Sequence, residues 1–168
     1  MTRRLLQDID SLKFSVSATT RKPRKGEKEG REYFFLSQET FRKKITEGEF
    51  LEWEEFYNGT LYGTLRSAVE NDLKKGYFVL LDIDVLGALN VKKKFGNQAL
   101  AVFLTPPSLE TLRKRLELRG TETPETLQIR IDRATTEMSY ADRFDAVVVN
   151  DDLETAYSEL LELVRNHQ

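Results

Sequence analysis

The chain has 168 residues, 39% of them hydrophobic and 32% charged, which suits one folded domain with an inserted subdomain and gives no sign of a membrane span. Its 26 Lys and Arg residues against 28 Asp and Glu residues give a net charge of -2, which argues against a general nucleic-acid binder. The absence of cysteine excludes a disulfide framework and a cysteine-ligated zinc site, and together with the lack of a signal peptide it predicts a cytoplasmic protein. The only histidine, His167, is next to the last residue, which leaves no Ser-His-Asp or metal-histidine site.

The first part of the chain is predicted to contain short strands. Alternating and aromatic residues favour strands at Lys13–Ala18, Tyr33–Leu36 and Phe50–Phe56. A helix is predicted at Glu39–Glu47, and Gly48 is a suitable residue to end it. We therefore expect a strand-rich insertion over residues 31–66.

From Gly76 onward, apolar strands alternate with longer amphipathic helices. Near-continuous apolar runs predict buried parallel strands at Tyr77–Ile83 and Leu100–Leu104. Helices are predicted at Val85–Lys94, Ser108–Leu118 with Ser108 as its N-cap, Pro124–Ala141 and Leu153–Asn166. This alternation predicts an α/β fold with a doubly wound parallel sheet, in which ligands bind at the C-terminal ends of the strands. The core is expected to comprise residues 1–30 and 67–168.

A basic run follows the first predicted strand and is a candidate phosphate site. It reads S-V-S-A-T-T-R-K-P-R, with Arg21 and Arg24 three residues apart. Guanidinium groups can bind phosphate oxygens through two parallel hydrogen bonds, and the hydroxyl groups of Ser17 and Tyr33 would help to orient the anion. The alternative is a solvated basic turn that leads into a strand.

Two later segments place acids on predicted strands: F-L-E-W-E-E-F at residues 50–56 and V-L-L-D-I-D at residues 79–84. Guanine presents N1–H and an amino group as donors and O6 as an acceptor, so carboxylates such as Glu52 and Asp84 and a nearby hydroxyl can select it. The alternative for Glu52 is an exposed strand face within an acidic cluster. Asp82 lies in an apolar run, where an unpaired carboxylate would be costly, so it is expected to point out at the strand end or to cap the turn at Gly87.

Six segments in order carry a family resemblance: the basic run, the two acidic segments with L-Y-G-T at residues 61–64 between them, R-G-T-E-T at 119–123 and V-V-V-N-D-D at 147–152. Together they closely resemble the guanylate kinase family over essentially the whole chain. The resemblance implies a P-loop-kinase-like fold with a GMP-binding insertion and a helical lid at about residues 115–135. It implies ATP-dependent phosphorylation of GMP to GDP, with Mg²⁺ on the ATP.

The resemblance also assigns residues to the GMP site. By this resemblance the guanine base would contact Ser17, Glu52, Thr64 and Asp84, and the GMP phosphate would contact Arg21, Arg24, Tyr33 and Tyr62. The family often has Ser where Thr64 stands, and the hydroxyl group is kept.

A second set of residues would serve ATP and catalysis. The resemblance implies that Arg119 and Arg130, beside the lid, neutralise the transferring phosphoryl group, and that Asp82 acts near Mg²⁺, indirectly. It places Asn150 against adenine. Arg115 is assigned to ATP as well, although an arginine on an amphipathic helix is most often simply solvated.

One family feature does not occur in these residues: no G-x-x-G-x-G-K-[ST] loop, which holds the ATP phosphates, is present. We therefore expect a truncated and weakly active chain that lacks the family's N-terminal strand as well as this loop. The alternative is a non-catalytic GMP-binding or protein-interaction module, and a substitute ATP site has no support in the sequence. GMP and ATP are the expected partners, without nucleic acid or membrane, and the oligomeric state cannot be predicted.

Overall fold

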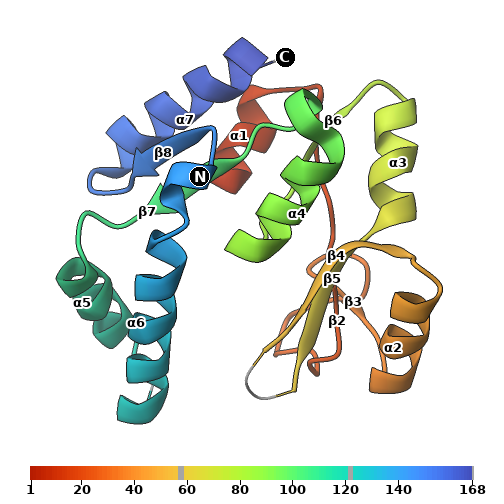
Figure 1. The fold of residues 1–168 in the computed structure, drawn as a ribbon, viewed down its shortest axis with the longest axis horizontal. Coiled ribbons are helices and arrows are strands. Elements are labelled where there is room, and N and C mark those ends of the chain that lie inside the picture. The colour runs from red at the N-terminus through yellow and green to blue at the C-terminus, as the bar shows by residue number, and fades with distance from the viewer. Residues whose placement is uncertain (57–58, 121–122, 168) are drawn as a thin grey trace. The chain divides into compact units, whose positions relative to one another are not determined.

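The computed structural model describes residues 1–56, 59–120 and 123–167. The chain forms two compact units, residues 1–91 and residues 92–168 (Figure 1). Within the described residues, no helix is both long and apolar enough to cross a membrane. The predicted division into a core of residues 1–30 and 67–168 and an insertion of residues 31–66 stays a prediction.

Unit 1 is built from short strands and helices. In chain order these are α1 (Thr2–Asp8), β1 (Leu12–Phe14), β2 (Ala18–Thr19), β3 (Phe34–Phe35), α2 (Gln38–Thr46), β4 (Phe50–Glu55), β5 (Leu61–Leu65), α3 (Arg66–Lys74), β6 (Phe78–Leu80) and most of α4 (Val85–Phe95). Strands β1 and β6 pair in parallel, and a separate sheet has the order β3-β2-β5-β4.

The β4–β5 pair carries three of the eight predicted GMP residues: Glu52, Tyr62 and Thr64. The two strands are antiparallel, so Glu52 lies opposite Thr64 and Glu54 lies opposite Tyr62. Gly63 is required between them, because a Cβ at this position would approach the backbone oxygen of Glu52 to 2.9 Å. The register therefore places an acid, a hydroxyl and a tyrosine on neighbouring positions of one sheet.

Helix α2 lies beside this sheet (Figure 1), and an apolar cluster of residues from both supports the sheet. Phe41 of α2 is fully buried and stacks on Phe50 of β4 with ring centroids 4.3 Å apart, and Ala18 and Leu61 complete the buried cluster. Such burial stabilises a folded protein by roughly 1.5–3 kcal/mol for each large side chain. The cluster therefore fixes β4, and with it Glu52, against the rest of unit 1.

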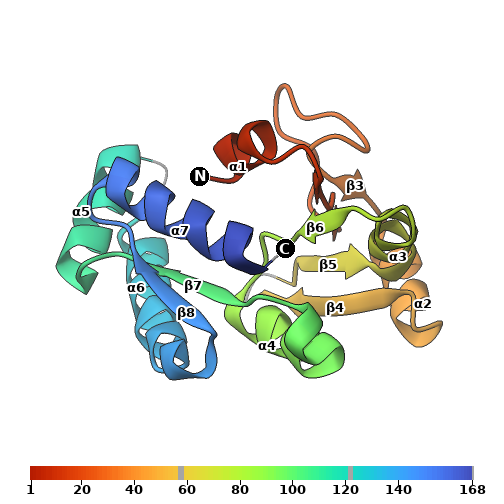
Figure 2. The same cartoon turned by 90° about the horizontal axis from the view of Figure 1, so that it is seen from above.

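Unit 2 begins within α4 and continues with longer helices. Its further elements are η1 (Gly96–Gln98), β7 (Val102–Thr105), α5 (Leu109–Arg119), α6 (Pro124–Met138), η2 (Ala141–Arg143), β8 (Ala146–Val149) and α7 (Leu153–His167). Strands β7 and β8 are parallel and lie side by side in Figure 2, and α7 contacts β8. Arg113 of α5 donates a hydrogen bond to Gln128 of α6, which ties these two helices together.

Most predicted elements are present with shifted ends. Ser108 caps α5 by accepting a hydrogen bond from the Thr111 N–H, and Gly48 ends α2 with a positive φ of 68°, both as predicted. The predicted strand Lys13–Ala18 is wrong: β1 and β2 join different sheets, and residues 15–17 carry the chain between them. The predicted strand Tyr77–Ile83 is regular only at β6, and the predicted helix to Ala141 ends at Met138.

Candidate functional site

Glu52 is a buried acid whose side chain is fixed by Thr64. Its side chain is 6% exposed, and its Oε1 atom accepts a hydrogen bond of 2.5 Å from the hydroxyl of the fully buried Thr64. The two residues face each other across β4 and β5. The alternative interpretation of Glu52 as part of an exposed strand face is therefore wrong, because this acid is enclosed while its neighbour Glu55 is exposed.

Asp84 lies just before α4, and its carboxylate caps the helix. Its Oδ1 atom accepts a 2.9 Å hydrogen bond from the Gly87 N–H, in the manner of an N-cap residue. The suggestion that Asp82 caps this turn is wrong, since Asp84 does so. A Cβ built on Gly87 would lie 2.7 Å from Glu52 Oε2 and 3.0 Å from Asp84 Oδ2, so the remaining oxygens of both acids converge on this glycine.

The pairing of two acids has an electrostatic consequence. Burial raises the pKa of Glu52 to about 7, and the charge of Asp84 adds to this rise, against the hydrogen bond from Thr64, which lowers it. A group that donates hydrogen bonds to these oxygens would favour the ionised form. The site therefore suits a ligand edge that carries N–H groups.

A second cluster in unit 1 centres on Arg21. Its Nη1 and Nη2 atoms donate hydrogen bonds of 2.9 Å to Oε2 and Oε1 of Glu27, and both side chains are largely buried. The Arg24 N–H donates a further hydrogen bond of 2.6 Å to Glu27. These contacts lower the pKa of Glu27, with Arg21 as the main cause, and the same pair raises the pKa of Arg21.

One edge of the Arg21 guanidinium is left open. Its Nε atom is buried and has no hydrogen-bond partner among the residues that the structure describes. Glu27 binds the Nη1/Nη2 edge, which leaves Nε–H and the second Nη2 hydrogen as a two-donor edge of the kind that binds phosphate. Hydrogen bonding with the Tyr62 side chain also raises the pKa of Arg21, so the Tyr62 hydroxyl is close to this guanidinium.

Two tyrosines and an acid complete the cluster. The Arg21 guanidinium lies 5.3 Å from the Tyr33 ring centroid, and the Tyr33 and Tyr62 rings lie 5.8 Å apart. Burial raises the pKa of Tyr33, and the Asp82 carboxylate makes a small contribution in the same direction. Asp82 is exposed two residues beyond β6, as predicted for an acid that points out at the strand end.

Two further predicted GMP residues take looser positions. The Arg24 side chain is exposed; its backbone N–H donates a hydrogen bond to Glu27, and its charge contributes to the lowered pKa of Glu27. Ser17 is half-buried, and its carbonyl oxygen accepts a hydrogen bond from the Phe34 N–H, which joins it to β3.

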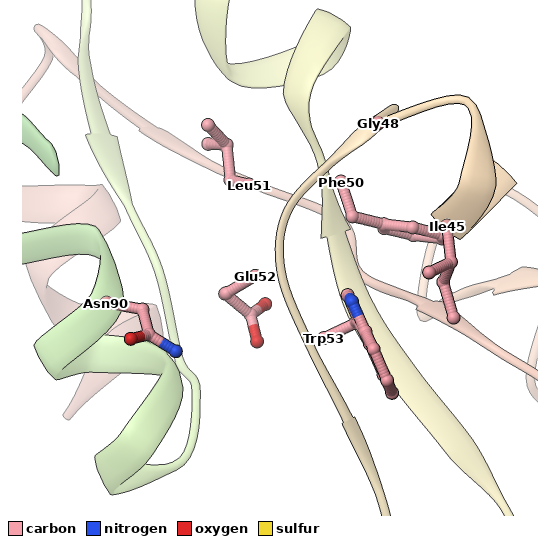
Figure 3. Close-up of a pocket in the computed structure, with 7 residues that line it drawn as sticks. All are labelled: Ile45, Gly48, Phe50, Leu51, Glu52, Trp53 and Asn90. Atoms are coloured by element: carbon pink, nitrogen blue, oxygen red, sulfur yellow. The ribbon is translucent and has the colours of Figure 1, made fainter.

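A pocket of about 450 Å³ opens beside β4 (Figure 3). Figure 3 shows the Glu52 carboxylate between Asn90 of α4 and Trp53 of β4. The other lining residues are Ile45, Gly48, Phe50 and Leu51. Glu52 is the one predicted guanine residue among these lining residues.

The remaining predicted residues belong to unit 2 and are described separately. Arg115 donates hydrogen bonds to the carbonyl oxygens of Asn150 and Asp151, at 2.7 and 3.3 Å, so it is not simply solvated but holds the segment after β8. Arg119 ends α5 and is exposed, and Arg130 is exposed on α6. Of the predicted lid, residues 121 and 122 lie outside the described residues.

Two residues of the site were not singled out for it from the sequence. Glu27 lies in the charged run K-G-E-K-E-G-R-E, which suggests a solvated segment, and the signal that could have identified it is its three-residue spacing from Arg24. Gly87 interrupts the helical pattern V-L-G-A-L-N, and an isolated glycine within a helix often has a packing or functional reason.

Comparisons with known proteins agree with this geometry. The family model described as guanylate kinase matches residues 1–167. A guanylate kinase from Salinibacter ruber is 54% identical over 98% of this chain and 87% of the relative, and one from Bacteroides thetaiotaomicron is 52% identical over 96% of this chain and 79% of the relative. A crystal structure of guanylate kinase from Anaplasma phagocytophilum matches with a TM-score of 0.82 and 34% identity, over 99% of this chain and 80% of that one. The predicted α/β fold class is confirmed by these matches.

Proposed function

This chain belongs to the guanylate kinase family, and we propose that unit 1 binds GMP as the acceptor of a phosphoryl group from ATP. The family assignment makes the protein a nucleoside monophosphate kinase that forms GDP. The observation that carries the proposal is the convergence of Glu52 and Asp84, each with one oxygen fixed by a hydrogen bond and one directed toward Gly87.

Guanine recognition would use these two acids. The N1–H and amino groups of guanine are donors, so they would bind Glu52 Oε2 and Asp84 Oδ2. The hydrogen bonds to the other oxygen of each carboxylate, Glu52 Oε1 and Asp84 Oδ1, hold these two acceptors in place. We assign the hydroxyl groups of Ser17 and Thr64 to the remaining polar atoms of the base. Adenine offers no N1–H, so AMP would leave a buried carboxylate oxygen unpaired.

The GMP phosphate would bind the Arg21 cluster. The open edge of Arg21 would donate two hydrogen bonds, and the hydroxyl groups of Tyr33 and Tyr62 would donate one each. Arg24, whose exposed side chain is free to turn toward the anion, would add a second positive charge. Glu27 would hold Arg21 in the orientation that leaves this edge open.

The donor half of the reaction would use residues of unit 2. We assign Arg119 and Arg130 to charge neutralisation on the transferring phosphoryl group, and Asn150 to adenine. Arg115 would act through its hydrogen bonds to the Asn150 and Asp151 carbonyls, which hold the adenine segment.

A magnesium ion fits the residues present if ATP supplies most of its ligands. The described residues contain no cluster of three acidic, histidine or cysteine side chains that could hold a metal by themselves. Mg²⁺ in kinases is commonly bound by one or two carboxylates, water and phosphate oxygens, so the exposed Asp82 is the residue we assign to it. Bound there with ATP, the ion would neutralise phosphate charge.

The experiment is calorimetric titration of the 168-residue chain with GMP, AMP and UMP. GMP is expected to bind more tightly than AMP, by about 1–3 kcal/mol for each buried group that AMP leaves unpaired. Glu52→Gln should remove most of this preference, and Glu55→Gln, on the same strand but exposed, should keep it. Equal affinity for GMP and AMP in the unsubstituted chain would contradict the proposal.

A second experiment tests the catalytic activity of residues 1–168 themselves, which contain no G-x-x-G-x-G-K-[ST] loop. Loss of one preorganised donor can cost about 10²–10³ in rate, so we expect these residues alone to form GDP far more slowly than the Salinibacter ruber guanylate kinase. A coupled assay for ADP and GDP formation compares the two proteins. Comparable turnover would show that ATP is held by residues not identified above.

A further inference from the structure

Gly87 occupies an unusual position for a glycine. It lies in the first turn of α4, a helix of 11 residues, and its φ is not in the left-handed region. Any other residue except proline would favour the helix more. The backbone therefore does not require glycine here, and the reason must lie in what surrounds the missing side chain.

The surroundings of Gly87 are the two acids of the proposed guanine site. A Cβ at this position would lie 2.7 Å from Glu52 Oε2, 3.2 Å from Glu52 Cδ and 3.0 Å from Asp84 Oδ2. A carbon cannot approach an oxygen to 2.7 Å without displacing it. The space beside the Gly87 Cα is thus filled by Glu52 Oε2 and Asp84 Oδ2. These are the carboxylate oxygens that do not take part in the hydrogen bonds to Thr64 and to the Gly87 N–H.

Gly87 also acts through its backbone. Its N–H donates to Asp84 Oδ1, which fixes the rotation of that carboxylate. Thr64 fixes Glu52 in the same manner from the other side. One residue therefore orients Asp84 and at the same time leaves room for Glu52.

We propose that Gly87 is a positioning residue for guanine recognition, because its missing side chain lets the Glu52 and Asp84 carboxylates converge on the two N–H donors of the base. This inference rests on the proposed function. The atoms that a methyl group would meet are the ends of two side chains, so the acids and not the backbone would move in a Gly87→Ala variant. Since Glu52 is buried and held by Thr64, its displacement would misalign the acid without unfolding the protein.

The test is calorimetric titration of wild type and Gly87→Ala with GMP and IMP. IMP keeps N1–H but lacks the exocyclic amino group, so the ratio of the two affinities measures the contribution of that amino group alone. Gly87→Ala is expected to weaken GMP binding about ten- to hundredfold and to bring its affinity close to that for IMP. Leu86→Ala is the matched control, because Leu86 is the preceding residue of the same helix and is 50% exposed.

Circular dichroism and thermal melting accompany the titrations. A folded Gly87→Ala variant with a collapsed GMP/IMP ratio supports the proposal, and in the Glu52→Gln background the same substitution should weaken GMP binding less. Equal weakening of GMP and IMP, an unchanged ratio, or a variant that does not fold would overturn it. If the wild-type chain showed no preference for GMP over AMP, the proposed function would fail together with the role of Gly87. If the wild-type chain preferred GMP but Gly87→Ala left the GMP/IMP ratio unchanged, only the role of Gly87 would fail.

Discussion

Glu52 should make the stability of this protein depend on pH in a direction opposite to that of an ordinary surface acid. Its pKa is about 7 in the folded protein, against an ordinary value of 4.5. The folded state therefore holds this proton more tightly than the unfolded state does, and stability falls as pH rises from about 4.5 to about 7. At 1.36 kcal/mol for each pKa unit, ionised Glu52 costs the folded state about 3 kcal/mol.

The perturbation that isolates this effect is Glu52→Gln. The glutamine oxygen can still accept the hydrogen bond from Thr64, but the side chain carries no charge. The variant should be more stable than wild type by about 2–3 kcal/mol at pH 8, and the difference should shrink to below about 1 kcal/mol at pH 5. Urea unfolding of both proteins at several pH values measures this difference.

The control is Glu55→Gln, since Glu55 is exposed and its ion pair with Arg42 at 3.1 Å is of the kind that contributes little. Its stability relative to wild type should barely change with pH. If the difference between wild type and Glu52→Gln were also constant from pH 5 to pH 8, Glu52 would not carry a raised pKa and the electrostatic reasoning would fail.

The affinity for GMP should rise with pH, whereas the stability of the free protein falls with pH. Guanine N–H groups favour the ionised acid, so binding below pH 7 must release a proton from Glu52. The association constant should then rise by up to about tenfold per pH unit below pH 7 and level off above it. Calorimetry in two buffers of different ionisation enthalpy counts the released proton, and Glu52→Gln should release none from this group.

Three further predictions concern the arginines. Arg24→Ala should weaken GMP binding more than guanosine binding in paired titrations. Arg24→Lys should restore only part of the GMP affinity, because an ammonium group lacks the forked geometry of a guanidinium. Equal losses of GMP and guanosine affinity would make Arg24 a structural residue. Glu27→Gln should weaken GMP binding about three- to tenfold and leave guanosine binding unchanged, since Arg21 loses its charged partner. Tighter GMP binding by this variant would mean that Glu27 competes with phosphate. Arg115→Ala should lower the free energy of unfolding by about 1 kcal/mol in urea, through lost hydrogen bonds to the carbonyls of Asn150 and Asp151.

Sequence periodicity located the helices of unit 2 well, because each has a local signal. Ser108 and Thr123 cap α5 and α6, and Pro124 begins α6, so the termini follow from residue type. Helix α3 was not predicted. Its N-cap position, Leu65, makes no side-chain capping bond, and only Val69 in it is buried, so neither a cap nor an apolar stripe marks it.

The sequence predicted candidate residues for the site but not the contacts between them. The change of sheet between β1 and β2 and the burial of Glu52 both depend on pairing with distant strands, which residue alternation does not encode. The pairing of Arg21 with Glu27 was missed for another reason. Alternating charges within a short polar run are consistent with many pairings, and only the packing of the Tyr33 ring near Arg21 selects one.

Three features of the proposed GMP site in unit 1 oppose the stability of the fold. Glu52 is a buried acid beside another acid, Gly87 is a glycine within a helix, and Arg21 keeps a buried Nε–H without a partner among the described residues. A sequence selected for folding alone would replace each of them, since an amide, an alanine and a paired donor cost less. Proteins depart from such rules mainly where binding requires it. The donors of guanine would bind the buried Glu52 carboxylate, and the phosphate would accept a hydrogen bond from the buried Arg21 Nε–H. One bound nucleotide therefore accounts for both of these unfavourable features.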